Sequence, residues 1–354
     1  MKGSKIMKRL KVIIIFAISL IAVSTVSAQD LLNTYFNGNK DSLVAAATNL
    51  INMPNPTFSQ FKSDQINTTA SSDNEPTNNA TDYYFSIRDN HKIFAYKFTN
   101  KSPNTIILIH GVKSSAINYQ KTAQMLQQAT QAEVYALDLR GHGKSEGKPG
   151  DVDYINQYAD DLANIVSSIR KNKPNGKIII AGHSMGGGIA LRYSMENSND
   201  KVDGFLLFAP LLGNNSPAFQ KEEASNNDST EAFMKIHIAR IIGLKMLNEI
   251  NRHDNDSLPD LFFNLPIGTP LREYSYRANA SMAPDYYIDG LKSVKVPLLV
   301  LVGDKDEAFV AEEQQKAVLE NSKGEVKIIE GATHNGLRLN QKAFQLITKW
   351  FSKL

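Results

Sequence analysis

Short runs of unbroken apolar residues constrain the fold of this chain more than any other sequence feature. Six of them, separated by stretches of helical periodicity, lie at residues 105–109, 134–139, 177–181, 204–208, 297–302 and 326–329. A strand that is apolar on both faces is typical of a parallel sheet covered by helices. Residues 83–87 and 92–98 are β-rich runs around the turn signal Asp89-Asn90, which predicts a hairpin. We therefore predict an α/β domain with an eight-stranded sheet, two strands antiparallel and six parallel, and helices on both faces.

Three segments outside these runs predict helices. Residues 41–52 have Asp41 or Ser42 as a candidate cap, and the C-terminal segment carries Phe344, Ile347 and Phe351 on one side. A third helix is predicted after Asp151 as its cap, with apolar residues recurring every three or four positions from Ile155 to Ile169.

A long insertion separates the last predicted strands. Almost 90 residues lie between Phe208 and Pro297, far more than a strand–helix–strand crossover needs. We expect residues 211–295 to form an inserted, mainly helical cap. Residues 233–250 are apolar on every side of a helical wheel, which fits either a core helix or one beside a hydrophobic ligand cavity.

The N-terminal region precedes this domain and has a different composition. Residues 1–28 combine a Lys/Arg cluster, an apolar stretch and small residues before Gln29, the pattern of a secretory signal peptide. We expect export to a periplasmic or extracellular compartment, and the alternative is an uncleaved membrane anchor. Residues 29–81 are predicted to be an extension and linker, because 53–81 are rich in Pro, Asn, Ser and Thr. The main domain would then span 82–354.

Charge and cysteine content exclude several classes of function. The chain has 39 basic and 36 acidic residues, and five of the basic residues lie within the first 28. Without that leader the balance becomes acidic, so we expect no nucleic-acid partner. The absence of cysteine excludes disulfides, a thiolate nucleophile and cysteine-ligated metals.

The strongest chemical motif is Gly182-His183-Ser184-Met185-Gly186, which follows an apolar run and precedes a helical stretch. A serine at such a sharp strand-to-helix turn has its hydroxyl exposed, and the flanking glycines prevent collision. A serine hydroxyl needs a base to take its proton and an acid to orient that base. In hydrolases built on this turn the order along the chain is serine, acid, histidine.

That order selects the other catalytic candidates. His334 is the only histidine beyond the last predicted strand, whereas His237 and His253 fall in the insertion and are expected to be structural or surface residues. The acid should follow the run 297–302, where both Asp304 and Asp306 stand. Their spacing alone does not separate them.

Two further motifs complete a resemblance to a known family. They are Ile109-His110-Gly111 and the stretch from Leu137 to Gly147, which contains Arg140-Gly141-His142-Gly143. With the Ser184 motif, they make residues 82–354 resemble the α/β-hydrolase superfamily, and within it the monoacylglycerol lipase, lysophospholipase and serine aminopeptidase (S33) branch. The resemblance implies the α/β-hydrolase fold and selects Asp306, which stands three residues after Gly303. It also implies an oxyanion hole formed by the backbone N–H groups of Val112 and Met185.

The resemblance further implies that His110 and Gly111 support the oxyanion loop, and that Arg140 and His142 support a neighbouring loop. We therefore expect an exported serine esterase acting on small esters or lipid-like monoacyl esters, such as a monoacylglycerol or a lysophospholipid. No cofactor or metal site is expected, and peripheral membrane contact through the cap or the leader is a further expectation. Two alternatives stay open. One is a serine aminopeptidase that uses cap acids among Glu249, Asp254, Asp256 and Asp260, and the other is a non-catalytic binding protein on the same fold.

Overall fold

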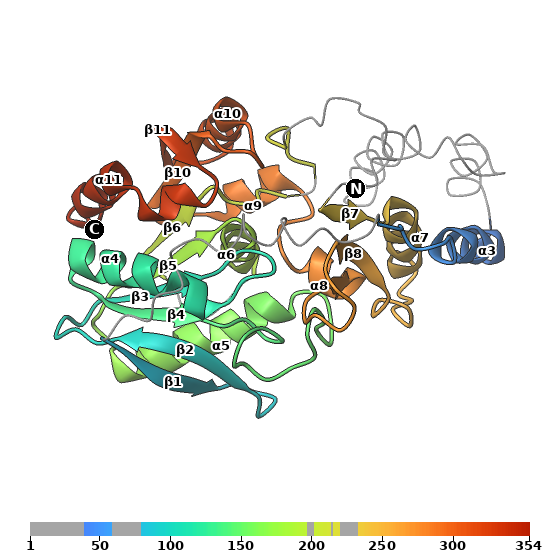
Figure 1. The fold of residues 1–354 in the computed structure, drawn as a ribbon, viewed down its shortest axis with the longest axis horizontal. Coiled ribbons are helices and arrows are strands. Elements are labelled where there is room, and N and C mark those ends of the chain that lie inside the picture. The colour runs from blue at the N-terminus through green and yellow to red at the C-terminus, as the bar shows by residue number, and fades with distance from the viewer. Residues whose placement is uncertain (1–38, 59–78, 197–201, 214, 220–232) are drawn as a thin grey trace. The chain divides into compact units, whose positions relative to one another are not determined.

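The structure is a computed structural model that describes residues 39–58, 79–196, 202–213, 215–219 and 233–354 (Figure 1). The predicted leader, residues 1–28, lies outside this described part. The described residues form two compact units, one from residues 39–58 together with 233–279, and the other from the described residues between 79 and 219 together with 280–354.

The larger unit is built on one eight-stranded sheet. Its strands, in spatial order, are β1 (Ala80–Ser86), β2 (Lys92–Phe98), β4 (Glu133–Leu137), β3 (Thr105–Ile109), β5 (Ile178–His183), β6 (Gly204–Phe208), β10 (Leu298–Lys305) and β11 (Glu325–Thr333). The predicted number of strands is confirmed. The predicted directions are wrong by one strand, because β2 pairs antiparallel with both β1 and β4 while all other pairs are parallel. Since β1 and β4 are both antiparallel to β2, β1 runs in the same direction as the other six strands, and only β2 runs the opposite way.

Helices cover both faces of this sheet (Figure 1). On one face, α4 (Gln120–Thr130) and α11 (Gln341–Phe351) bury Leu126, Ile347 and Trp350 against residues such as Ile106 and Ile179. Successive residues of a strand point to opposite faces, so Ile107 and Ile180 face the other side. There α5 (Gln157–Asn172), α6 (Met185–Met195), α9 (Tyr287–Ser293) and α10 (Ala311–Asn321) pack as neighbours.

The helix predicted after Asp151 exists as α5, but its predicted cap is wrong. Asn156 occupies the N-cap position, and α5 begins at Gln157. Asp151 lies in the preceding loop, where its carboxylate accepts the N–H of Val152 at 2.9 Å and contacts Lys148 Nζ at 3.2 Å.

The smaller unit contains the middle of the predicted cap. Its strands β7 (Met234–Ile236), β8 (Pro259–Phe263) and β9 (Glu273–Ser275) form an antiparallel sheet, and its helices include α7 (Ile238–Asn248) and α8 (Tyr276–Ala280). Residues 233–250 were expected to be one helix, and the structure divides them into β7 and α7. The last part of the predicted cap, residues 280–295, belongs to the larger unit.

The N-terminal helix α3 (Lys40–Ile51) is part of this smaller unit. Its N-cap is Asn39, two or three residues before the predicted caps, and the Asn39 side chain accepts the N–H of Ser42 at 2.9 Å. On α7, Arg240 donates to the carbonyl oxygen of Ile51 at 3.1 Å, and His237 Nε2 donates to that of Met53 at 2.9 Å. Residues 39–58, predicted to be an extension, therefore fold together with the cap segment.

Candidate active site

Ser184 stands at the turn between β5 and α6, as the sequence predicted. Its φ of 52° lies in the left-handed region, which is strained for a residue with a side chain and is common at functional sites. The turn is fixed on both sides of the residue. The Ser184 N–H donates to the carbonyl of Phe208 at 3.0 Å, and its own carbonyl accepts the N–H of Leu211 at 2.9 Å. The side chain is half-buried, so the hydroxyl keeps access to its surroundings.

Two glycines make this turn sterically feasible. A Cβ atom on Gly182 would lie 2.3 Å from the carbonyl oxygen of Gly186, and one on Gly186 would lie 2.4 Å from that of Ile109. Both obstacles are backbone atoms that cannot rotate away. The glycine requirement predicted from the motif therefore has a direct steric cause.

Asp306 and His334 meet at the carboxyl edge of the same sheet. Asp306 follows β10 and His334 follows β11, and the distance from Asp306 Oδ2 to His334 Nδ1 is 2.9 Å. The Asp306 side chain is fully buried and that of His334 is 12% exposed. Asp306 Oδ1 also accepts the N–H groups of Ala308 and Phe309, each at 2.8 Å, so the carboxylate is held in one orientation. In a neutral imidazole that donates from Nδ1, Nε2 carries no proton and can accept one.

Asp304, the competing acid, has a different partner. Its Oδ1 accepts the N–H of Gly331 at 2.6 Å, which ties the end of β10 to the end of β11. The structure thus brings Asp306 rather than Asp304 to His334.

The loop after β3 lies against Ser184. A Cβ atom on Gly111 would be 3.4 Å from the Cβ of Ser184. His110 Nδ1 donates to the carbonyl oxygen of Gly111 at 2.8 Å, and its Nε2 accepts the N–H of Leu139 at 3.1 Å. Burial, with a contribution from the charge of nearby His142, lowers the pKa of His110 to about 3, so the ring is neutral and holds this one tautomer.

These contacts orient the peptide between Gly111 and Val112. The carbonyl and N–H of a trans peptide point in opposite directions, so fixing the Gly111 carbonyl on His110 also fixes the direction of the Val112 N–H. Met185 is the first residue of α6, and its N–H belongs to the first turn, which has no partners within the helix. Both predicted oxyanion donors thus lie in backbone that flanks Ser184.

The neighbouring loop after β4 is held by ion pairs of the buried Arg140 side chain. Arg140 donates to both carboxylate oxygens of Asp161, at 2.8 and 2.9 Å, and to Asp89 at 2.7 Å. His142 Nδ1 donates to the carbonyl oxygen of Arg140 at 2.9 Å, and burial lowers the pKa of His142 to about 4. All these contacts are internal to the loop and its surroundings, in keeping with the supporting roles that the sequence resemblance implied.

The two histidines of the insertion have structural contacts. His237 is the N-cap of α7, where its Nδ1 accepts the N–H of Arg240 at 3.1 Å. His253 contacts the carboxylate of Asp256 at 2.9 Å on the surface of the smaller unit.

Sequence reasoning missed three residues around the site. Glu307 accepts the N–H of His334 at 3.0 Å, Tyr119 Oη lies 2.6 Å from His183 Nδ1, and the guanidinium of Arg338 lies 4.5 Å from the centre of the Tyr119 ring. Tyr119 and Arg338 come from the short 3₁₀ helices η3 (Ala116–Tyr119) and η4 (Gly336–Leu339). No periodicity or motif in the sequence marked either residue.

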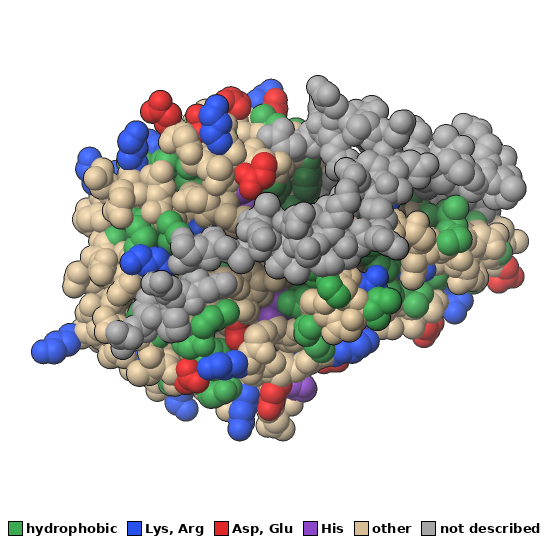
Figure 2. Space-filling view, viewed as in Figure 1, with side chains coloured by type: hydrophobic (Ala, Val, Ile, Leu, Met, Phe, Trp, Pro, Cys, Tyr) green, Lys and Arg blue, Asp and Glu red, His purple; other side chains and the backbone are tan. Residues whose placement is uncertain are grey.

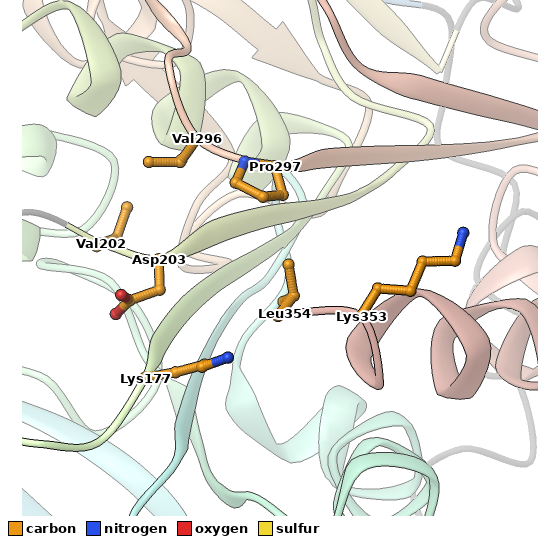
Figure 3. Close-up of a pocket in the computed structure, with 7 residues that line it drawn as sticks. All are labelled: Lys177, Val202, Asp203, Val296, Pro297, Lys353 and Leu354. Carbon is orange, nitrogen blue, oxygen red and sulfur yellow. The ribbon is translucent and has the colours of Figure 1, made fainter.

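Two pockets, of about 400 and 660 Å³, lie at the opposite edge of the sheet. The first is lined by residues that precede β5, β6 and β10, among them Lys177, Asp203 and Pro297 (Figure 3). Its lining contains no pair of nucleophile and base. Within the described ranges, no group of three or more His, Asp or Glu side chains could hold a metal ion. No described helix is both long and apolar enough to cross a bilayer.

Comparison with known proteins agrees with this architecture. The sequence profile of the serine aminopeptidase S33 family matches residues 100–259. Monoglyceride lipase of Rattus norvegicus is 32% identical over 112 residues, which cover 31% of this chain and 36% of that protein. Monoacylglycerol lipase of Mycolicibacterium smegmatis is 38% identical over 88 residues, which cover 25% of this chain and 31% of that protein. The matched region therefore spans about a third of the length of these curated relatives.

Among solved structures, a bromoperoxidase from Bacillus anthracis superposes with a TM-score of 0.55 at 20% identity, covering 77% of this chain and all of that one. The sheet order, the turn at Ser184 and this superposition define an α/β-hydrolase fold. The sequence matches, each of which covers less than half of this chain, show a similarity to the monoacylglycerol lipase-like proteins.

Proposed function

We propose that this protein is an exported serine hydrolase that cleaves carboxylic esters of lipid-like monoacyl compounds, such as monoacylglycerols or lysophospholipids. The proposal rests mainly on how the larger unit positions Ser184, Asp306 and His334. A strained Ser184 at a helix N-terminus and a buried Asp306–His334 pair at 2.9 Å occupy the same carboxyl edge of a parallel sheet. Ligand sites in open α/β sheets lie at that edge.

The proposed reaction follows from which atoms can give and accept protons at each step. Ser184 Oγ attacks the acyl carbon while His334 Nε2 takes the hydroxyl proton, and Asp306 stabilises the imidazolium through Nδ1–H. The carbonyl oxygen becomes an oxyanion that accepts hydrogen bonds from the Val112 and Met185 N–H groups, each such donor being worth about 3 kcal/mol. The proton on Nε2 then passes to the leaving alkoxide. Water, deprotonated by the same nitrogen, attacks the acyl carbon of the acyl-enzyme, the bond to Ser184 Oγ breaks, and Oγ takes the proton back from Nε2 as the acid leaves.

The substrate class is supported by the names of the relatives and by the charge of the surface. The two relatives described above are lipases that act on monoacylglycerols by name. On the face of the molecule shown in Figure 2, acidic and basic side chains are interspersed over the described surface, which argues against nucleic acid as the ligand. We also propose that the cap or the leader makes peripheral contact with a membrane.

A substrate panel tests the proposal. p-Nitrophenyl esters of increasing chain length and a monoacylglycerol are offered to the wild-type protein and to Ser184→Ala. We expect turnover that rises with acyl length and falls by about 10³-fold or more in the variant, with an unchanged melting temperature. Hydrolysis that survives in Ser184→Ala would assign the activity to another site.

A serine aminopeptidase is the second candidate, and the description of the matched family profile favours it. A substrate amine would need an accessible carboxylate, yet Asp256 and Asp260 are both buried, and Asp256 already accepts from Asn248 and contacts His253. Aminoacyl p-nitroanilides in the same panel decide between the two. Turnover of these amides above that of the esters would select the peptidase. A folded protein inert toward every substrate would favour a non-catalytic binding protein.

Export is a separate part of the proposal and rests on the leader sequence. The mass of the protein recovered from the culture medium or periplasm tests it, with a chain beginning at Gln29 expected. A full-length chain in the membrane fraction would indicate an uncleaved anchor instead.

A further inference from the structure

A chain of three hydrogen bonds runs through the larger unit beside Ser184. The N–H of Gly111 lies 2.9 Å from Tyr119 Oη, which lies 2.6 Å from His183 Nδ1, and His183 Nε2 lies 3.0 Å from the carbonyl oxygen of His334. Tyr119 and His183 are each no more than 2% exposed. The chain thus connects the loop after β3, the turn at Ser184 and the loop that carries His334.

The direction of every hydrogen bond in this chain is determined by its two ends. The backbone N–H of Gly111 can only donate, and the carbonyl of His334 can only accept. Burial, together with the charges of His334 and Arg338, lowers the pKa of His183 well below its usual value, so its ring is neutral. His183 therefore donates from Nε2 and accepts at Nδ1, and Tyr119 gives its only proton to His183 while accepting from Gly111.

Arg338 makes a second connection between the same loops. It lies in η4, which begins two residues after His334, and its guanidinium stacks over the Tyr119 ring at 4.5 Å from the ring centre. The same side chain donates to the carbonyl oxygen of Asn118 at 2.8 Å. A cation over the face of an aromatic ring is an attractive contact, and it is stronger when both groups are removed from water.

We propose that Tyr119 and His183 are positioning residues that hold the oxyanion loop and the His334 loop at a fixed distance on either side of Ser184. This role rests on the proposed function, since it concerns the donors and the base of that reaction. Tyr119 fixes the peptide on the N-terminal side of Gly111, and His110 fixes the peptide on its C-terminal side, which carries the Val112 N–H. Without the Tyr119 hydroxyl, the Gly111 N–H is buried without this partner, and His183 loses the contact that sets its tautomer.

The expected cost falls on the rate of the chemical step rather than on substrate affinity. Neither side chain serves as nucleophile, base or oxyanion donor, so their loss acts only through displaced loops. A displacement of about 1 Å in a catalytic group costs up to roughly 100-fold in rate. We therefore expect kcat to fall by about 10- to 100-fold with KM changed by less than about threefold.

The experiment compares Tyr119→Phe, His183→Gln and the double variant with the wild-type protein. Tyr135→Phe is the matched control, because Tyr135 is also buried and its hydroxyl donates to Glu133 at 2.8 Å, in the middle of β4. A short p-nitrophenyl ester gives kcat and KM. Titration with a fluorophosphonate counts reactive Ser184 residues, so that kcat is expressed per competent site and a loss of folded protein is not mistaken for a loss of rate.

The proposal predicts full titration of every variant, a lower kcat per site for both single variants, and a double variant no slower than the slower single one. That non-additivity is expected of residues acting as one chain. A kcat per site for Tyr119→Phe within twofold of wild type, or an equal loss in Tyr135→Phe, would overturn the positioning role alone. Failure of the fluorophosphonate to label the wild-type protein would overturn the proposed function and this role with it.

Discussion

Two carboxylates separated by a single residue show how position decides the role of a side chain. Asp306 is buried, accepts hydrogen bonds from two backbone N–H groups and contacts His334. Asp304 Oδ1 instead accepts a hydrogen bond from the N–H of Gly331. Both are aspartates at the carboxyl end of β10, Asp304 within the strand and Asp306 just after it, so neither composition nor spacing could separate them. The resemblance to a family selected Asp306, and the geometry assigns it the contact with His334.

Substitution of the two aspartates by asparagine gives opposite expectations. Asp306→Asn keeps the shape but removes the charge that stabilises the imidazolium and favours its tautomer, so we expect kcat to fall by about 10³- to 10⁴-fold. Asp304→Asn keeps an acceptor oxygen for Gly331 and should stay within about threefold of wild type. Steady-state hydrolysis of a p-nitrophenyl ester by both variants measures this, and equal losses would contradict the assignment.

Other residues at this scale could not be predicted. Tyr119 lies eight residues after Gly111 and 64 before His183, with which its hydroxyl pairs. Arg338 is 220 residues away from Asn118, whose carbonyl it binds. Such pairs form only when folding brings distant parts of the chain together, and a single sequence carries no local signal for them.

At the scale of elements, the sequence predicted the buried strands well. The strands β2, β3 and β6 have the predicted bounds, since each is an apolar or β-rich run with a clear turn at both ends. The strands β7, β8 and β9 were all missed. The strands β7 and β9 have three residues each, too few to show an alternating pattern, and two of the three β7 residues are exposed.

Because α3 packs closely against α7, we expect a glycine-to-alanine substitution in α7 to lower the stability of the protein rather than raise it. Gly243 lies inside α7, where replacement of glycine by alanine ordinarily stabilises a helix by about 0.5–1 kcal/mol. A Cβ atom at this position would lie 2.6 Å from the carbonyl oxygen of Ala47 and 2.8 Å from Ile51. We therefore expect Gly243→Ala to destabilise the protein, by about 1–3 kcal/mol.

Thermal unfolding of the full chain, with and without the substitution, measures this effect. Asn248→Ala, at the end of the same helix, is a control for helix propensity without the close approach to α3, although it removes a hydrogen bond to Asp256. An increase in melting temperature for Gly243→Ala would mean that α3 does not pack against α7 as described.

At the scale of the whole molecule, the division into units was the least predictable feature. The smaller unit joins residues 39–58 with the segment around α7, and the pair Met53–His237 is separated by 184 positions. The composition of residues 53–81 favoured a linker, because Asn, Pro and Thr rarely form regular elements. Two described residues at the start of this segment nevertheless have bound backbone carbonyls, since His237 Nε2 donates to that of Met53 and Lys235 Nζ donates to that of Thr57 at 2.8 Å.

The smaller unit also carries a buried acid that makes stability depend on pH. Asp260 is fully buried, its Oδ1 accepts from Asn279 at 3.1 Å, and its Oδ2 has no hydrogen-bond partner within the part of the chain that the structure describes. Burial raises the pKa of Asp260 to about 7, although Asn279 and the charge of Arg240 oppose the shift. The folded state therefore holds the proton more tightly than the unfolded state does.

A raised folded-state pKa stabilises the protein at low pH, and this contribution is lost as the pH rises from about 4 to about 7. Asp260→Asn does not titrate, so we expect its melting temperature to rise relative to wild type between pH 5 and pH 8. Melting curves at each pH unit measure the difference. Asp254→Asn, which alters an exposed pair with Arg252, is the control, and a difference independent of pH would contradict the buried state of Asp260.

The proposed function depends on Ser184 being the activated nucleophile of the molecule. Its most direct test is covalent labelling of the intact protein with a fluorophosphonate, followed by peptide mass spectrometry. We expect one label, on Ser184, formed rapidly in the wild-type protein and absent from Ser184→Ala, with labelling slowed strongly in His334→Ala. A folded wild-type protein that takes no label, or one labelled at a different residue, would contradict it.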